Sequence, residues 1–283
     1  MEVIRAKSAG FCMGVGLALR KLDELLADQS LAAPICTFGP LIHNPQVLKE
    51  YEELGVACSE NPEEIEAGSI VLIRAHGVPR LVYERLAASG LKVADATCPK
   101  VMKAQRLIAK EAAKGGILLL YGEEDHPEVR GLLSHAANGA IVFGSLEELP
   151  EDALDPRESY FLAAQTTQDD AGFERTRERL LHLLGREIPV LRTICDATQK
   201  RQEEVIALSG TVNMIVVVGG RNSGNTRRLA KVAQDRGVPC VHVETADELP
   251  LEKMRGLARI GLTAGASTPK KIIDAVETAL LKL

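Results

Sequence analysis

Short apolar runs alternate with amphipathic stretches along the whole 283-residue chain, and this alternation constrains the fold more than any other feature. Each run is rich in leucine or β-branched residues and ends in glycine or small polar residues. The clearest runs are SIVLIRAHG, GILLLYGEED, ESYFLAAQTT, MIVVVGGRNSG and ARIGLTAGAST. Strands that alternate with helices of about 10–15 residues form βαβ units and parallel sheets covered on both faces. The pattern therefore predicts an α/β fold, with ligand sites at the carboxyl ends of the strands.

The composition narrows the classes of partner. Aromatic residues are 3% of the chain and tryptophan is absent, so the core must be aliphatic. The net charge is −5 and no run of Lys or Arg exceeds two residues, which leaves no electrostatic footprint for nucleic acid or an anionic membrane. The amino terminus lacks the apolar region of a signal peptide, and the longest apolar runs are too short to span a bilayer. We expect a cytoplasmic protein whose six cysteines stay reduced.

Three cysteines in similar settings indicate an internal repeat. Cys12, Cys98 and Cys195 are 86 and 97 residues apart, and the last two lie in the related stretches ADATCPK and ICDATQK. A polar loop follows each cysteine after 28 to 31 residues, and a second one after 64 to 72 residues. The loop side chains are His43, His76, His126, Thr166, Ser223 and Ser267. We predict three similar α/β modules, residues 1–97, 98–194 and 195–283, that form one compact body.

If the modules surround a pseudo-threefold axis, the three thiols converge on it. Three thiolates without a fourth suit a metal centre with one open coordination position, either a catalytic zinc or an iron–sulfur cluster. The alternative is that each cysteine is a small buried hydrophobe. The shared strand-end setting favours the metal. The remaining cysteines, Cys36, Cys58 and Cys240, lack this setting and are predicted to be structural.

The polar loops predict an anion site. Loops that enter helices expose N–H groups, and the helix dipole adds favourable potential for an anion. The loop GGRNSGNT at 219–226 comes within one residue of a P-loop, but Asn225 replaces the lysine that must reach the phosphates. A nucleoside triphosphatase is therefore disfavoured, and a phosphate or diphosphate held by Ser, Asn, His and backbone amides fits better. Arg74 and Arg221 border these loops and are weaker candidates.

One carboxyl group completes the candidate site. Glu128 follows His126 in the first turn of a predicted helix, where an acid is ordinary because the helix dipole favours it. Beside thiols, histidines and hydroxyls it is the carboxyl group placed to transfer a proton, which Thr166 could relay or orient. The acids at 123–125 are predicted to face solvent. Three other histidines, His135, His182 and His242, are predicted to be structural.

Nine short motifs occur along the chain in an order that resembles one known protein family. They are GFCMGV, IHN, AHGV, DATCP, HPEVRG, QTT, ICDATQKRQ, GGRNSGN and TAGAS. In this order they resemble the 4-hydroxy-3-methylbut-2-enyl diphosphate reductases, the terminal enzymes of the methylerythritol phosphate route to isoprenoids. The resemblance runs from residue 3 to about residue 270. It implies a trefoil of three α/β modules in a pseudo-threefold arrangement around a central iron–sulfur cluster.

The resemblance also implies the roles of individual residues. Cys12, Cys98 and Cys195 would ligate a [4Fe–4S] cluster whose fourth iron is open to the substrate hydroxyl. Glu128 would donate the protons, and Thr166, rather than Thr167, would order the hydroxyl end of the substrate. The diphosphate would be held by His43, His76, His126, Ser223, Gly224, Asn225 and Ser267. Two electrons, from a donor such as ferredoxin or flavodoxin, and two protons would remove water to give isopentenyl and dimethylallyl diphosphates.

Gly224 departs from the family pattern, because some relatives carry a second serine there; a backbone N–H can replace that contact. Three other functions stay open from the residues alone. A non-catalytic iron–sulfur redox sensor with an anion pocket would not need Glu128. A cysteine-nucleophile enzyme would need one thiol instead of three. A metal-free phosphate-binding protein would contain no iron.

Overall fold

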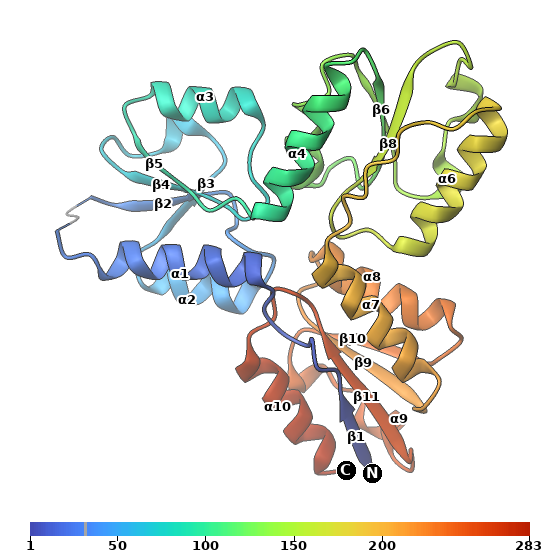
Figure 1. Cartoon of the computed structure of the whole chain (residues 1–283). Coiled ribbons are helices and arrows are strands. Elements are labelled where there is room, and N and C mark those ends of the chain that lie inside the picture. The colour runs from blue at the N-terminus through green and yellow to red at the C-terminus, as the bar shows by residue number, and fades with distance from the viewer. Residues whose placement is uncertain (31–32) are drawn as a thin grey trace. The chain divides into compact units, whose positions relative to one another are not determined.

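The computed structural model describes residues 1–30 and 33–283. Within these ranges the strands form three sheets in which every pairing is parallel (Figure 1). The predicted α/β fold is confirmed. The chain divides into two compact units: Met1–Gly16, Ile42–Tyr51 and Asp196–Leu283 form the first, and Leu17–Leu41 and Glu52–Cys195 form the second. No described helix combines enough length with enough apolar surface to cross a bilayer.

The sheet of the first unit has the strand order β1-β11-β9-β10. Its strands are β1 (Glu2–Arg5), β9 (Met214–Val218), β10 (Cys240–Val243) and β11 (Arg259–Ala264). β1 runs parallel to β11, with Arg5 opposite Leu262. The first strand of the chain therefore pairs with residues near the carboxyl terminus, whereas the predicted first module, 1–97, groups it with residues 35–95. The three-module division stays a prediction.

Helices cover both faces of this sheet, as alternate strand residues show. Val216 and Val218 share a buried cluster with Ile273 of α10 (Lys270–Leu281). The neighbouring Ile215 and Val217 belong to a second cluster, with side chains from α7 (Asp196–Ser209) and α8 (Gly224–Asp235). The short segments η4 (Ala246–Glu248) and α9 (Leu251–Met254) lie between β10 and β11 in the chain. Helices α1 (Met13–Ala27) and α2 (Pro45–Glu53) begin within this unit.

The second unit contains two sheets. The first has the order β3-β2-β4-β5, with β2 (Ile35–Phe38), β3 (Ala57–Ser59), β4 (Ile70–Ile73) and β5 (Lys92–Asp95). The second has the order β7-β6-β8, with β6 (Ile117–Tyr121), β7 (Ala140–Phe143) and β8 (Tyr160–Ala164). Their helices are α3 (Arg80–Ala88), α4 (Pro99–Ala112), α5 (Pro127–Leu133) and α6 (Asp170–Leu184). Short 3₁₀ turns occur at η1 (Pro62–Glu64), η2 (Leu146–Glu148) and η3 (Glu151–Ala153).

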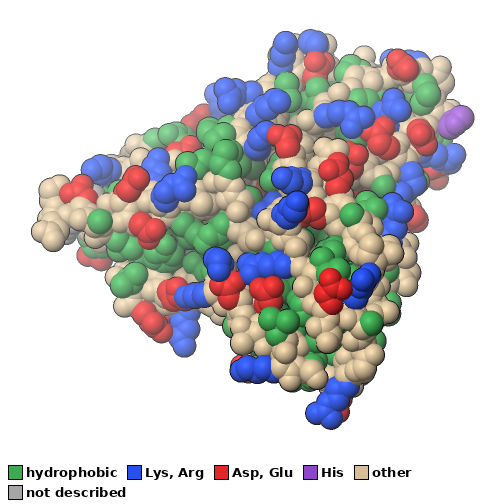
Figure 2. Space-filling model, turned by 60° about the horizontal axis from the view of Figure 1, so that its bottom comes forward, with side chains coloured by type: hydrophobic (Ala, Val, Ile, Leu, Met, Phe, Trp, Pro, Cys, Tyr) green, Lys and Arg blue, Asp and Glu red, His purple; other side chains and the backbone are tan. Residues whose placement is uncertain are grey.

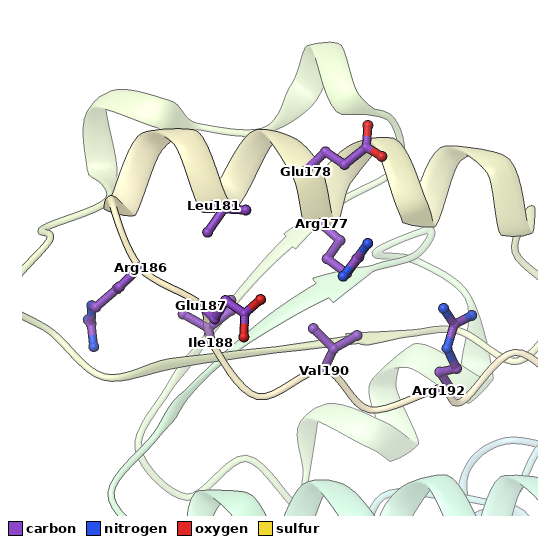
Figure 3. A pocket seen from close by; sticks show the side chains of 8 residues that line it. All are labelled: Arg177, Glu178, Leu181, Arg186, Glu187, Ile188, Val190 and Arg192. Carbon is purple, nitrogen blue, oxygen red and sulfur yellow. The ribbon is translucent and has the colours of Figure 1, made fainter.

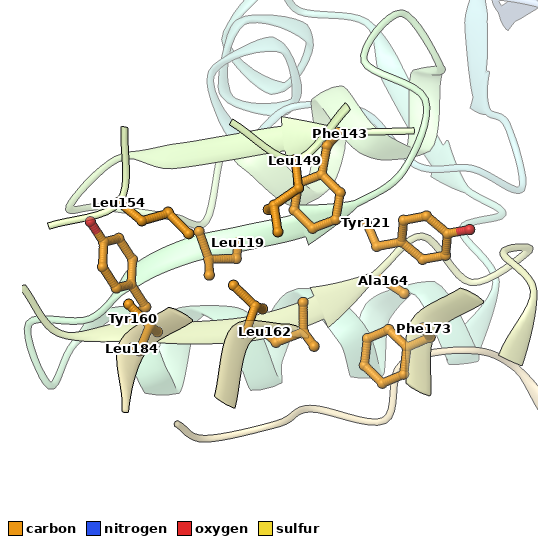
Figure 4. Packing of buried hydrophobic residues seen from close by; sticks show 11 residues of the cluster. Leu119, Tyr121, Phe143, Leu149, Leu154, Tyr160, Leu162, Ala164, Phe173 and Leu184 are labelled. Carbon is orange, nitrogen blue, oxygen red and sulfur yellow. The ribbon is translucent and has the colours of Figure 1, made fainter. Parts of the chain in front are cut away.

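The β7-β6-β8 sheet shows why these apolar runs form buried strands. Leu119 and Leu162 point to one face, where they pack with Phe173 of α6 (Figure 4). Leu118 and Leu120 belong to the opposite cluster, which includes side chains of α4 and α5. Because both faces are covered, the strand is apolar throughout instead of alternating. Each fully buried leucine contributes about 1.5–3 kcal/mol relative to an exposed one.

The surface of the molecule is mixed in charge. On the face in Figure 2, Lys and Arg side chains are interspersed with Asp and Glu, with apolar and neutral side chains between them. Several charged side chains of the described residues form ion pairs at close range, such as Arg179 with Glu151 at 2.5 Å. This interspersion agrees with the small net charge of −5.

The predicted site residues follow the carboxyl ends of the strands. In chain order, His43 follows β2, His76 follows β4, Cys98 follows β5, His126 follows β6, Thr166 follows β8, Ser223 follows β9 and Ser267 follows β11. Because neighbouring parallel strands end at the same edge, the loops after β6 and β8 lie together, as do those after β4 and β5 and those after β9 and β11. The fold therefore places the candidate chemistry at the sheet edges where α/β proteins bind ligands.

Candidate functional site

The backbone N–H of each candidate cysteine makes the same kind of hydrogen bond. Cys98 N–H donates to Ala75 O at 2.9 Å, beside His76. Cys195 N–H donates to Thr166 O at 2.9 Å, and Cys12 N–H donates to Ala266 O at 3.0 Å, beside Ser267. Each bond therefore ties a cysteine to one of the polar loops that the sequence predicts, and the arrangement occurs three times.

The three thiols lie where a helix begins and are half-buried. Cys98 is the N-cap residue of α4, with a proline in the first turn, and Cys12 and Cys195 directly precede α1 and α7. Val15 N–H also donates to the sulfur of Cys12 at 3.4 Å. N–H groups and the positive end of a helix stabilise a thiolate. The three cysteines therefore share one setting, at the start of a helix.

The other cysteines occupy different surroundings. Cys36 is buried within β2, and burial raises the pKa of its thiol. Cys240 lies on the edge strand β10, where burial raises the pKa of its thiol to about 11. Cys58 is exposed on the edge strand β3. Raised pKa values keep Cys36 and Cys240 protonated near neutral pH.

In the second unit, the structure brings Glu128 and Thr166 into direct contact. Thr166 N–H donates to Glu128 Oε1 at 2.6 Å, and Thr166 Oγ1 donates to Glu128 Oε2 at 2.9 Å. Glu128 is 1% exposed and lies in the first turn of α5. The neighbouring Thr167 instead accepts a hydrogen bond from Gln165 Nε2 at 3.2 Å. Both oxygens of this buried carboxyl group are therefore held by one residue of the loop after β8.

Burial raises the pKa of Glu128 to about 7, and the two hydrogen bonds from Thr166 oppose this rise. Desolvation disfavours the charged carboxylate, whereas donors to the carboxylate stabilise it. Near neutral pH the group is thus balanced between its two forms, as a general acid requires. The hydroxyl of Thr166 can donate to the carboxylate or accept from the carboxylic acid, so the contact is available in both states.

Two predicted histidines accompany Glu128 in this unit. His126 is the N-cap residue of α5, and its Nδ1 accepts a hydrogen bond from Glu128 N–H at 3.1 Å. The rings of His76 and His126 meet edge to face, with centroids 5.3 Å apart. Because Nδ1 of His126 accepts this bond, a proton on the neutral ring lies on Nε2, which can then donate to another group.

In the first unit, the predicted anion loop forms the start of α8. Ser223 is the N-cap residue, and its hydroxyl accepts a hydrogen bond from Thr226 N–H at 3.3 Å. Asn225 is 4% exposed, and within the described residues neither its amide nitrogen nor its amide oxygen has a hydrogen-bond partner. A buried amide without partners costs about 1–3 kcal/mol for each unsatisfied group, so a bound group that hydrogen-bonds to this side chain would offset the cost.

The adjoining loops of the first unit approach each other closely. Ser267 Oγ donates to His43 O at 3.0 Å, which joins the loop after β11 to the residues before α2. A Cβ atom at Gly220 would lie 2.6 Å from the same carbonyl oxygen. Only glycine therefore allows the loop after β9 to pass this close to His43. Ser223, Gly224 and Asn225 follow in the same loop.

We predict that Gly220→Ala destabilises this loop. The added methyl group would meet a backbone carbonyl, which cannot rotate away, and overpacking of this kind costs about 1–3 kcal/mol. Thermal unfolding should show the loss. The matched control is Gly210→Ala, where the added carbon would meet only Ala207 O at 3.8 Å and is expected to leave the melting temperature unchanged. Equal melting temperatures for Gly220→Ala and the wild-type protein would contradict this account.

Other predicted residues lie in surface or supporting contacts. Arg74 and Arg221 pair with Glu60 and Glu248, each at 2.6 Å, so both guanidinium groups already have a carboxylate partner. In the loop 123–125, the last two acids are exposed as predicted, and the first is half-buried. Of the histidines predicted to be structural, His182 is exposed, His135 is half-buried, and His242 Nε2 lies 2.8 Å from Gly219 O.

A further cavity of about 290 Å³ lies between α6 and residues 186–192 of the second unit (Figure 3). Arg177 and Arg192 line it, but both pair with Glu174, at 3.0 and 2.5 Å. Arg186 donates to the backbone carbonyl of Pro156 at 3.2 Å. Because these cations are already engaged within the protein, the cavity offers a bound anion little charge.

The sequence pattern did not single out Thr193. It is 6% exposed, lies two residues before Cys195, and makes two hydrogen bonds to Ala164 at the end of β8. The only sequence signal was its position in the stretch RTICDATQK. The segment around it has no alternating or apolar strand pattern, so the sequence does not predict that this threonine pairs with β8.

Fold and site together define an α/β protein in which parallel sheets present thiols, histidines and a buried carboxyl group at their carboxyl ends. The chain belongs to the LytB protein family, whose profile matches residues 3–281. The family resemblance of the nine motifs is thereby confirmed.

Curated relatives agree over the full length. The 4-hydroxy-3-methylbut-2-enyl diphosphate reductase of Nitratidesulfovibrio vulgaris strain Miyazaki F is 58% identical over all of both chains. The enzyme of the same name from Aquifex aeolicus is 40% identical over all of this chain and 97% of its own. Among solved structures, the E-1-hydroxy-2-methyl-but-2-enyl-4-diphosphate reductase of Plasmodium falciparum has a TM-score of 0.91 at 26% identity, covering 98% of this chain and 87% of its own. The structure of (E)-4-hydroxy-3-methyl-but-2-enyl diphosphate reductase, described as the terminal enzyme of the non-mevalonate pathway, has a TM-score of 0.70 at 38% identity over all of both chains.

Proposed function

We propose that this protein reductively removes the hydroxyl group of 4-hydroxy-3-methylbut-2-enyl diphosphate to give isopentenyl and dimethylallyl diphosphates. The reaction consumes two electrons and two protons and releases one water. Family membership and relatives of the same name over the full length support the proposal. The structural observation that carries it is the buried Glu128 carboxyl, which is held by Thr166 and has a pKa near neutrality.

We propose that Cys12, Cys98 and Cys195 ligate a [4Fe–4S] cluster. The donor set fits such a group: three half-buried thiols, each at the start of a helix and each tied through its N–H to a polar loop. Soft thiolates are the ligands that iron–sulfur clusters take. When bound, the cluster would supply electrons singly and an iron with an open position for the hydroxyl oxygen. Delivery of those electrons by a ferredoxin or flavodoxin, in the cytoplasm, stays a prediction from the sequence.

The diphosphate is proposed to bind the polar loops, through His43, His76, His126, Ser223, Gly224, Asn225 and Ser267. The start of α8 supports this role, because it combines backbone N–H groups, a helix dipole and the unsatisfied amide of Asn225. Fixing the charged end of the substrate limits where its hydroxyl end can lie. Positioning of this kind accounts for a large part of enzymatic rate enhancement.

Glu128 is proposed to deliver the protons. In its protonated form the carboxylic acid can donate toward the departing oxygen, while Thr166 holds the group in one orientation through its N–H. The Thr166 hydroxyl can accept a hydrogen bond from the carboxylic acid and donate one to the carboxylate that forms when the proton leaves. Burial of the carboxyl group also keeps bulk water away from the proton.

The contribution of Asn225 can be measured separately from the chemistry. Asn225→Ala is expected to raise KM about 10–100-fold with a smaller change in kcat, because a hydrogen bond to a charged group is worth about 1.5–3 kcal/mol. Asn225→Asp should raise KM further, since its carboxylate repels a diphosphate. Steady-state kinetics with the allylic diphosphate gives both values. An unchanged KM in both variants would remove Asn225 from the binding site.

The proposed function is tested by purifying the protein without oxygen, measuring iron and sulfide, and supplying substrate with a chemical one-electron reductant. We expect about three to four irons with matching sulfide per chain, and formation of both product diphosphates. Iron without turnover would favour the redox sensor. Turnover or diphosphate binding without iron would favour the metal-free alternatives.

A further inference from the structure

The segment that leads to Cys195 differs from those that lead to the other two cysteines. The regular strand β5 precedes Cys98, and its pairing continues as Ala96 N–H donates to Ile73 O at 3.0 Å. The strand β1 precedes Cys12, and Ala6 N–H donates to Leu262 O at 2.8 Å. Residues 186–195 do not form a regular strand, and one isolated parallel bridge joins them to β8. The approach to Cys195 must therefore be held in another way.

Hydrogen bonds nevertheless connect this segment to β8 in register. Leu162 N–H donates to Pro189 O at 2.9 Å, and Leu191 N–H donates to Leu162 O at 2.8 Å. Four residues further along both segments, Cys195 N–H donates to Thr166 O. The pairing thus begins beside the middle of β8 and ends at the candidate cysteine.

Thr193 fills the gap between these main-chain bonds. Its Oγ1 accepts a hydrogen bond from Ala164 N–H at 2.8 Å and donates to Ala164 O at 2.6 Å. One hydroxyl can do both, because it has one donor and two acceptor sites. The side chain therefore supplies the donor and the acceptor that the main chain of a neighbouring strand would supply. Since Ala164 is fully buried, its N–H and C=O would be costly to leave without these two hydrogen bonds.

We propose that Thr193 is a positioning residue for proton transfer, which fixes residues 164–166 so that Thr166 holds the carboxyl group of Glu128 in its reactive orientation. The proposal rests on the proposed role of Glu128 as the proton donor. Thr166 lies two residues beyond Ala164, and its backbone and hydroxyl must reach both oxygens of Glu128 at once. A displacement of about 1 Å in such a contact can cost about 10²-fold in rate.

Thr166, which Thr193 helps to hold through Ala164, joins two parts of the candidate site. Thr166 donates to Glu128 through its N–H and hydroxyl, and it accepts from Cys195 through its carbonyl. Residue 166 is thus held from both sides, and Thr193 bonds to Ala164, two residues before it. Loosening Thr193 should change the environment of Glu128 without removing a group that contacts substrate.

The test compares Thr193→Val with Thr193→Ser in the protein purified with its iron. Valine keeps the shape and loses both hydrogen bonds, whereas serine keeps the hydroxyl. Thr193→Val should lower kcat at least about tenfold, leave KM for the diphosphate within about twofold, and retain iron. Thr193→Ser should return kcat close to the wild-type value. The matched control is Thr176→Val, which removes another buried hydroxyl bond, from Thr176 Oγ1 to Gly172 O at 2.9 Å in α6.

The pH profile separates positioning from a general loss of stability. His126, the N-cap residue of α5, and His76, in the loop after β4, are the imidazoles beside Glu128, and both are unchanged in Thr193→Val and in Thr176→Val. Weaker bonds from Thr166 would oppose the desolvation of Glu128 less, so the alkaline limb of kcat should move to higher pH in Thr193→Val. Thr176→Val should keep the wild-type profile.

Hydrogen exchange supplies a readout besides activity. In the wild-type protein, the amides of Ala164 and Cys195 should exchange as slowly as those within β8. In Thr193→Val they should exchange at least about tenfold faster, and in Thr176→Val they should not. Equal kcat and pH profile in Thr193→Val and Thr176→Val would overturn the proposal. If Thr193→Val does not fold, fast exchange of these two amides in the wild-type protein would overturn it.

Failure of this proposal is distinct from failure of the proposed function. Inactive Glu128→Gln together with unaffected Thr193→Val would reject only the positioning role. Fully active Glu128→Gln would reject the proton-donor role on which both depend.

Discussion

The Glu128→Gln variant is expected to retain iron and substrate binding and to turn over about 10²–10⁴-fold more slowly than the wild-type protein. Glutamine has the same shape, and both contacts with Thr166 can persist: its carbonyl accepts from the N–H, and its amide donates to the hydroxyl. What it lacks is a proton that it can release. Single-turnover kinetics under anaerobic conditions, with iron analysis of the same samples, measures the effect.

The control for this variant is Glu124→Gln, four residues earlier, in the loop before α5. Glu124 is exposed, so its charge is screened by solvent, and the substitution should leave kcat unchanged. Glu128→Asp adds an intermediate case, because the shorter side chain keeps the acid but cannot keep both Thr166 contacts. Wild-type turnover in Glu128→Gln would exclude the carboxyl group as the proton donor and return the redox sensor to consideration.

The activity of the wild-type protein should decline as the pH rises through about 7. Burial places the pKa of Glu128 at about this value, and the protonated form is the one that donates. The decline should be absent from the residual activity of Glu128→Gln, since that side chain does not titrate. A pH profile of kcat for the two proteins, measured with a reductant whose potential is held constant, tests this.

The same group makes stability depend on pH. Its pKa in the folded protein, about 7, lies above its ordinary value of 4.5, so the folded state binds the proton more tightly than the unfolded chain does. The stabilisation is complete below the ordinary value and is lost as the pH rises through about 7, at a cost of about 3 kcal/mol. Glu128→Gln avoids this cost. Its melting temperature relative to the wild-type protein should therefore be higher at pH 9 than at pH 6.

Local patterns were sufficient to predict the strands and the loops that follow them. The runs at 117–121 and 214–218 form β6 and β9, and the polar residues predicted beyond them lie at the carboxyl ends. This succeeds because a strand covered on both faces must be apolar throughout, and because parallel strands leave their loops at one edge. Thr166, which the family resemblance favours over Thr167, contacts Glu128, and its role toward the substrate stays a prediction.

Long-range pairing was not predictable in this way. β1 lies beside β11, and nothing in the four residues of β1 indicates a partner more than 250 positions away. Thr193 was not predictable for a related reason. Its hydroxyl bonds to Ala164, 29 residues earlier in the chain, and the sequence around it shows no strand or helix period. Both cases depend on tertiary contacts that bring together segments with no local signature of each other.

Replacing any one of Cys12, Cys98 and Cys195 by alanine is expected to remove most of the iron and to reduce turnover below detection. A cluster held by three thiolates has no spare protein ligand, so loss of one leaves an iron bound only by the inorganic core. Iron and sulfide analysis, with the visible absorption spectrum, measures the effect in anaerobically purified protein. The cysteine-nucleophile alternative makes a different prediction, since one thiol would be essential and the other two dispensable.

Cys240→Ala is the matched control, because Cys240 is likewise half-buried but lies on an edge strand, where its raised pKa keeps it protonated. It should retain iron and activity. Circular dichroism of each variant distinguishes loss of ligand from loss of fold. The cysteine N–H bonds that tie each thiol to a polar loop are main-chain bonds, so they persist in the alanine variants and the loops should keep their places. Iron retained at the wild-type level by any one of the three variants would therefore exclude that thiol as a ligand. It would not affect the proposed anion-binding role of the loops in the first unit.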